Sequence, residues 1–225
     1  MRQGMRLVTL VLGALLAGAL HAAPAKQPGV NEIVSGVQKL YDGTRDFSAS
    51  FEQEYVMAAL GRSHKSRGKV AYRRPGKIRF DYVEPAAKTF AVDGGTLWVH
   101  QVDDKQVLVD RCFKADGLTA SLVFLGGGGR ISDQFDVTLG TGDDQHHALV
   151  LKPRTPQGMF KSITLWVDKK TLEVHRTDVE DQSGNPNRFF FSDVRRNKGV
   201  KDEQVTFTPP KDAAVSPVPG SCATP

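Results

Sequence analysis

The stretch VAYRRPGKIRFDYVEP, residues 70–85, predicts two strands joined by a tight turn. The turn falls at Arg-Arg-Pro-Gly, residues 73–76, because proline and glycine interrupt a strand ladder. Every second residue on either side of the turn is apolar: Val70, Tyr72, Ile78, Phe80 and Tyr82. This alternation predicts a hairpin with one apolar and one polar face.

The basic residues of this stretch do not indicate a nucleic-acid partner. The chain has 225 residues, of which 40% are hydrophobic and 24% are charged, an ordinary balance for one or two globular domains. The formal net charge is +5. Removing residues 1–22 leaves 28 basic and 25 acidic side chains, a net charge of only +3.

The N-terminus has the pattern of a secretory signal peptide. Arg2 and Arg6 form a positive start, Leu7 to Leu20 carries no charge, and small residues follow. The apolar run is too short for an ordinary membrane-spanning helix. We expect cleavage near Ala22 or Ala23, residues 1–22 as the signal peptide, and an exported protein that is not lipidated, since no cysteine follows the run.

Only two cysteines are present, Cys112 and Cys222, and both lie in the expected mature chain. An oxidising compartment favours their pairing. Such a bridge would tie the proline-rich tail, about residues 211–225, to the body of the protein. Two free thiols, or pairing with another chain, remain the alternatives.

The rest of the mature chain, residues 23–225, predicts one mainly β domain. Apolar residues at helical spacing predict a helix over 31–42, and a short apolar segment over 116–125 predicts a second helix before Gly126–Gly129. No composition shift indicates a second domain. Short alternating strands are expected from residue 47 onward, across the hairpin, and at 89–92, 96–99, 106–110, 135–139, 148–152, 162–168, 173–180, 188–194 and 204–208.

No motif for catalysis or metal binding is present in the sequence. His146 and His147 are adjacent, so on a strand they point to opposite faces and cannot chelate together simply. The four glycines at 126–129 lack the Lys-Ser/Thr of a phosphate-binding loop. The sequence therefore indicates no enzyme, no cofactor and no metal site.

The apolar faces of the strands are the informative feature. A curled sheet with two short helices could leave an apolar hollow uncovered, but alternation alone favours a packed core. If a hollow exists, its expected lining is Phe51, Val70, Tyr72, Ile78, Phe80, Tyr82, Phe90, Val92 and Trp98.

Five segments in order resemble the outer-membrane lipoprotein carrier (LolA) family. Each is weak alone, but their order and spacing match over about residues 30–210. They are FSASFEQ (47–53), GKV (68–70), RRPGKIRF (73–80), DGGTLW (93–98) and FTPP (207–210).

The resemblance implies an incompletely closed antiparallel β-barrel of about 10–11 strands with a helical lid over an apolar cavity. It also implies a monomeric periplasmic carrier that binds the acyl chains of lipoproteins. Its expected partners are acylated lipoproteins, an inner-membrane ABC-type exporter and an outer-membrane receptor.

The resemblance also assigns roles to single residues. Arg74 matches the family arginine that holds the lid closed, a role suited to a guanidinium that donates several hydrogen bonds. The expected lid residues are Leu118, Leu122, Val123 and Leu125. The alternative reading of Arg74 is a solvated turn residue.

A regulatory half-barrel that senses lipid or lipoprotein in the envelope is the alternative function. Proteins of that class usually carry a second domain, and this mature chain is too short for one. The acylated receptor of the carrier pathway would need a cysteine directly after the signal peptide, which is absent.

Overall fold

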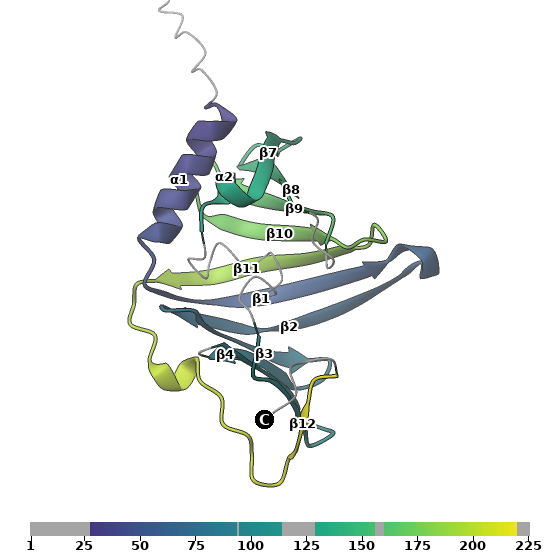
Figure 1. Ribbon diagram of the computed structural model, residues 1–225. Helices are drawn as coiled ribbons and strands as arrows, with labels where there is room; N and C mark the ends of the chain where they lie inside the picture. The colour runs from purple at the N-terminus through teal and green to yellow at the C-terminus, as the bar shows by residue number, and fades with distance from the viewer. Residues whose placement is uncertain (1–27, 94, 114–128, 156–159, 220–225) are drawn as a thin grey trace, which may run out of the picture.

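The computed structural model describes residues 28–93, 95–113, 129–155 and 160–219. Its described part is one long sheet with two α-helices set against it (Figure 1). The helices are α1 (Val30–Asp42) and α2 (Ile131–Gln134), and short 3₁₀ turns are η1 (Ala58–Leu60) and η3 (Asp202–Gln204). The first strands are β1 (Asp46–Met57), β2 (Arg62–Arg73), β3 (Lys77–Glu84), β4 (Lys88–Asp93), β5 (Thr96–Gln101) and β6 (Gln106–Asp110). The later strands are β7 (Phe135–Leu139), β8 (His146–Pro153), β9 (Ser162–Asp168), β10 (Val174–Glu180), β11 (Pro186–Arg196) and β12 (Ala214–Pro217).

The sheet is open. Its strand order is β12-β6-β5-β4-β3-β2-β1-β11-β10-β9-β8-β7, so β12 and β7 are the two edges among the described residues. Neighbouring strands are antiparallel except β12 and β6, which run parallel. The expected mainly β, incompletely closed fold is thus confirmed, with 12 strands in the described part of the chain instead of 10–11.

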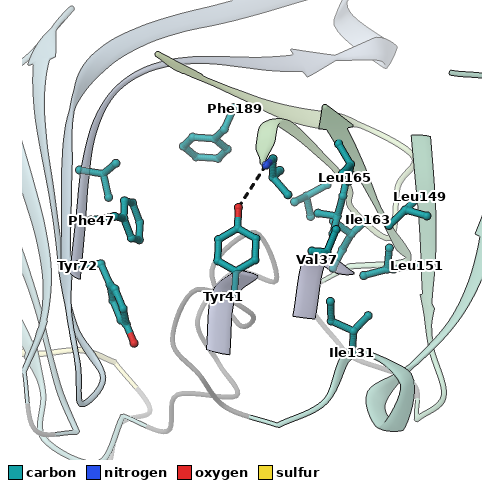
Figure 2. Packing of buried hydrophobic residues seen from close by; sticks show 14 of the residues in the cluster. Val37, Tyr41, Phe47, Tyr72, Ile131, Leu149, Leu151, Ile163, Leu165 and Phe189 are labelled. Carbon is teal, nitrogen blue, oxygen red and sulfur yellow. Dashed lines mark hydrogen bonds between the residues drawn. The ribbon is translucent and has the colours of Figure 1, made fainter. Parts of the chain in front are cut away.

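Helix α1 forms where the sequence predicts it. Gly29 precedes it in extended backbone and Gly43 follows its end. Its buried side chains, Ile33, Val34, Val37 and Tyr41, recur at helical spacing and lie on one stripe. That stripe packs on the sheet, and we call the sheet face that α1 covers the inner face. Figure 2 shows Val37 and Tyr41 between Phe47 and Tyr72 on one side and Leu149 to Leu165 on the other.

The expected strand at 204–208 is wrong. Residues 202–204 form η3, and the chain then continues without a strand until β12 at Ala214. Val205 is fully buried and Phe207 packs on the Trp98 ring, with 5.8 Å between ring centroids. The alternation in this segment therefore reflects packing against the outer face of the sheet. A packed segment of this kind and a strand can show the same alternation of apolar and polar residues.

The segment after β11 is tied to the outer face by arginines. Arg73 Nη1 donates to Val200 O at 3.2 Å, and Arg79 Nη1 donates to Thr206 O at 2.9 Å. This path leads the chain to β12, which lies in the expected proline-rich tail and pairs with β6. The tail is thus attached to the sheet by a strand that the sequence did not predict.

The pairing of Cys112 with Cys222 stays a prediction, because Cys222 lies outside the described residues. The strand register is compatible with it. Pro217 of β12 is paired with Val109 of β6. Because the two strands run parallel, they end at the same edge of the sheet.

Candidate functional site: the aromatic inner face and Arg74

Strand pairing brings most of the expected cavity lining onto the inner face. Phe80 of β3 is paired with Val70 of β2 and with Phe90 of β4. Ile78 is likewise paired with Tyr72 and Val92. Because directly paired residues share a face of the sheet, these side chains form one surface.

The aromatic rings of this surface contact one another in a chain. Phe51 of β1 lies 4.9 Å from Tyr82 and 5.4 Å from Phe80, measured between ring centroids, in edge-on geometry. Tyr82 in turn lies 5.8 Å from Phe90. Such edge-on pairs are the arrangement that aromatic quadrupoles favour. We call the full set the aromatic wall: Phe51, Phe80, Tyr82, Phe90, Phe189 and Phe191.

Gly68 is what allows these rings to approach. It is paired with Phe51 on one side and with Tyr82 on the other. A Cβ at this position would lie 2.9 Å from Phe51 Cε1 and only 2.1 Å from the Asp81 backbone oxygen. The glycine is therefore required by backbone and ring packing together.

Strand β11 contributes two rings that the sequence analysis did not include, Phe189 and Phe191. A shift in register opposite Ser48–Ser50 lies at Asp193, whose φ is +53°. This bulge adds one residue, so Val194 joins Phe191 on the inner face although strict alternation would place Asp193 there. The alternation of Phe189 and Phe191 in the sequence could have indicated that both rings lie on the same face of the sheet.

Trp98 is not part of the aromatic wall. It is paired with Ala91 and Val109, whereas its neighbours Leu97 and Val99 are paired with Val92 and Phe90. Adjacent residues of a strand point to opposite faces, so Trp98 lies on the outer face, where its ring contacts Phe207. The structure therefore separates Trp98 from the other expected lining residues.

Lys88 borders the aromatic wall and was also missed by the sequence analysis. Its Nζ lies 4.4 Å from the centroid of the Tyr82 ring and 4.8 Å from that of Phe90. Burial lowers the pKa of the Lys88 amine and raises the pKa of the Tyr82 hydroxyl. Both shifts indicate a weakly hydrated environment at this end of the wall.

An apolar cleft lies where α1 meets the wall. Its cavity volume is only about 20 Å³, and it is lined chiefly by Tyr41, Phe47, Val174, Phe191 and Val194. The Tyr41 hydroxyl accepts a hydrogen bond from the Val174 backbone nitrogen at 3.3 Å (Figure 2). Burial raises the pKa of Tyr41 to about 12.

Arg74 joins the hairpin turn to the end of α1. Its Nη2 donates to the backbone oxygen of Tyr41 at 2.9 Å, a carbonyl in the last turn of the helix. A cation at this position is also favoured by the helix dipole. Arg74 is thus not a solvated turn residue, and its observed partner belongs to α1.

Two polar atoms beside this contact have no hydrogen-bond partner among the described residues. They are Arg74 Nε and Tyr72 Oη, and both are buried. The Tyr72 side chain is only 1% exposed and its ring stacks on Phe47 with 5.4 Å between centroids. Burial raises the pKa of Tyr72, while the positive charge of Arg74 opposes that rise.

The other expected site residues cannot be placed. Leu118, Leu122, Val123 and Leu125 lie outside the described residues. Within the described ranges, no group of three or more His, Cys, Asp or Glu side chains is arranged to hold a metal ion. No helix in the described part of the chain is long and apolar enough to cross a membrane.

Comparisons with known proteins agree with the fold and with the apolar inner face. Residues 42–208 match the family described as outer membrane lipoprotein carrier protein LolA. An outer-membrane lipoprotein carrier protein of Chromobacterium violaceum is 27% identical over 201 residues, covering 89% of this chain and 95% of that protein. The corresponding protein of Chromohalobacter salexigens is 26% identical, covering 92% of this chain and 94% of that protein.

A solved structure supports the fold alone. An uncharacterized conserved protein from Thermus thermophilus superposes with a TM-score of 0.53 at 15% identity, covering 84% of this chain and 98% of that one. The family match spans most of the chain, including the aromatic wall and Arg74. The chain therefore belongs to the LolA family of outer membrane lipoprotein carrier proteins.

Proposed function

We propose that this protein is a periplasmic carrier that binds the acyl chains of lipoproteins on its inner face. The supporting observation is the aromatic wall, an apolar surface on which Tyr82, Phe90 and Phe191 are only partly buried. Large apolar side chains left partly uncovered beside a cleft are typical of a surface that binds an apolar ligand.

The proposed route has two partners. An ABC-type exporter of the inner membrane supplies the acylated lipoprotein, and a receptor in the outer membrane accepts it. The carrier is a monomer of one domain, residues 23–225, after cleavage of the signal peptide near Ala22 or Ala23. N-terminal sequencing of the exported protein tests the cleavage site.

Acyl chains impose a requirement for release. Each buried methylene contributes roughly 0.8 kcal/mol, so a complex of several long chains would be nearly irreversible if nothing opposed it. A carrier must therefore have apolar contacts in its empty state that the lipid replaces. The packing of Tyr41 and Phe47 around the cleft beside α1 provides contacts of this kind.

The carrier function is tested by lipoprotein release from spheroplasts. The purified mature protein is added to spheroplasts, and newly made lipoprotein is measured in the soluble fraction. We expect release by the wild type. Normally folded protein that releases no lipoprotein would contradict the proposal.

A pair of variants tests the inner face. Phe90→Asp places a charge on the aromatic wall and should abolish release. Phe190→Asp is the matched control, because Phe190 is 39% exposed and its neighbours Phe189 and Phe191 point to the opposite face. Equal loss with both variants would show that the inner face is not the binding surface.

A second pair tests Arg74. We expect Arg74→Leu to accept lipoprotein but to transfer it poorly to the outer membrane, since the contact with the Tyr41 carbonyl is lost. Arg73→Leu is the control, because Arg73 bonds Val200 O on the outer side. Unimpaired transfer by Arg74→Leu would exclude a gating role.

A further inference from the structure

The end of the aromatic wall nearest the hairpin turn combines an apolar surface with unused hydrogen-bonding capacity. Tyr72 lies near the end of β2, and Arg74 follows the strand in the hairpin turn. The charge of Arg74 acts on the Tyr72 hydroxyl, so the two side chains lie near each other. Tyr72 Oη and Arg74 Nε are buried and have no partner among the described residues. Buried polar groups of this kind are uncommon in folded proteins, and a bound water, an ion or a functional role can explain them.

The lack of a partner is not general among the buried tyrosines, as Tyr41 of α1 shows. Tyr41 Oη receives a hydrogen bond from Val174 N, and the Tyr41 carbonyl receives one from Arg74 Nη2. The guanidinium of Arg74 is therefore fixed by one nitrogen while Nε stays unused. Figure 2 shows the Tyr72 hydroxyl at the end of its ring away from Phe47.

The chemistry of the two atoms specifies what they can bind. Arg74 Nε can only donate a hydrogen bond, and a tyrosine hydroxyl can donate as well. Arg74 also has no ion pair with a described residue, so the site is positive and excludes a metal cation. Two donors in an apolar setting suit an oxygen acceptor carried by an otherwise apolar molecule.

We propose that Tyr72 and Arg74 bind the carbonyl oxygen of an acyl ester, with the attached hydrocarbon chain lying on the aromatic wall. The proposal rests on the carrier function above and adds a specific contact to it. Beyond Tyr72 the inner face continues through Ile78 and Phe80, which offer no polar atom to an ester. At the other end of the wall the Tyr82 hydroxyl and the Lys88 amine also carry polar atoms, so Tyr82 is the competing position for the ester.

The test compares two lipopeptides that differ only in the carbonyl groups. One carries two palmitoyl chains in ester linkage to glycerol, and the other carries two hexadecyl chains in ether linkage. Binding of each is measured for the wild type, Tyr72→Phe and Tyr82→Phe. Tyr82→Phe is the matched control, because Tyr82 lies on the same wall at the opposite end of β3.

We expect the wild type to bind the ester lipopeptide about threefold to tenfold more tightly than the ether. Tyr72→Phe should lose most of this preference while binding the ether as the wild type does. Tyr82→Phe should keep the preference. The melting temperature of Tyr72→Phe, measured alongside, checks that the variant is folded.

Two results would overturn the proposal, and they can be told apart. If the wild type binds both lipopeptides equally, or if Tyr72→Phe weakens both equally, the ester contact is absent while the carrier function stands. If the wild type binds neither lipopeptide more tightly than the unacylated peptide, the proposed carrier function fails, and the ester contact fails with it.

Discussion

The inner face of the sheet has two halves that differ in composition and in burial. The aliphatic half, on β8 and β9 beneath α1, consists of Leu149, Leu151, Ile163, Leu165 and Val167, whose exposures are 0–1%. The aromatic half is the aromatic wall on β1, β3, β4 and β11, where Tyr82, Phe90 and Phe191 stay only partly buried.

We expect this difference to separate stability from the proposed lipid binding. Branched aliphatic side chains pack closely and lose much free energy when a cavity is made among them. The partly buried rings of the aromatic half are, under the proposed function, the surface that receives the acyl chains. The aliphatic half thus holds the sheet and α1 together whatever the aromatic half contains.

The largest effect is expected from Gly68→Val. The new Cβ would lie 2.1 Å from the Asp81 backbone oxygen, which cannot move away as a side-chain end could. We expect a loss of about 3 kcal/mol or more in the free energy of unfolding, measured by urea denaturation. Gly29→Ala is the control, because nothing lies within 4 Å of its added Cβ. Similar stability of the two variants would contradict the requirement for glycine between the rings.

Leu165→Ala and Phe90→Ala test the two halves directly. Leu165 is fully buried, and its truncation should cost about 3 kcal/mol while lipopeptide affinity per folded molecule is retained. Phe90 is partly buried, so its truncation should cost about 1–2 kcal/mol but weaken lipopeptide binding several-fold. If Leu165→Ala weakens binding more than Phe90→Ala does, the division of roles is wrong.

The sequence predicts which face of the sheet a side chain occupies only where apolar and polar residues alternate. Residues 70–82 alternate apolar with polar side chains, so the face of Phe80 and Ile78 followed from the sequence. In TLWV, residues 96–99, both alternate sets are apolar, and only the register with β4 decides that Trp98 points outward. The expectation that Trp98 lines the hollow was therefore wrong about its face.

Other features depend on contacts between distant residues. The bulge at Asp193 moves Val194 to the inner face because of its pairing with β1, which no local pattern records. The bond from Arg74 to the Tyr41 carbonyl joins residues 33 positions apart, and its specific geometry is set by how α1 lies across the sheet. The resemblance indicated that Arg74 matters, whereas its partner had to come from the structure.

The smallest effect is expected at the boundary between the halves, where Tyr41 bonds Val174 N. Tyr41→Phe should cost about 1 kcal/mol at pH 7, because the Val174 N–H loses its acceptor. Burial raises the pKa of Tyr41 to about 12, so the folded protein keeps this proton when the unfolded chain has lost it. The stability that Tyr41 contributes is therefore fully present below pH 10, the usual value for tyrosine, and is lost as the pH rises towards 12.

In urea titrations between pH 7 and 11.5, the stability of the wild type should consequently fall more steeply than that of Tyr41→Phe above pH 10, so that the two curves meet and then cross. Curves that stay parallel over this range would mean that Tyr41 ionises in the folded state as it does in the unfolded chain. The cleft beside α1 would then be hydrated, and the boundary would belong to the accessible aromatic half instead of the packed aliphatic one.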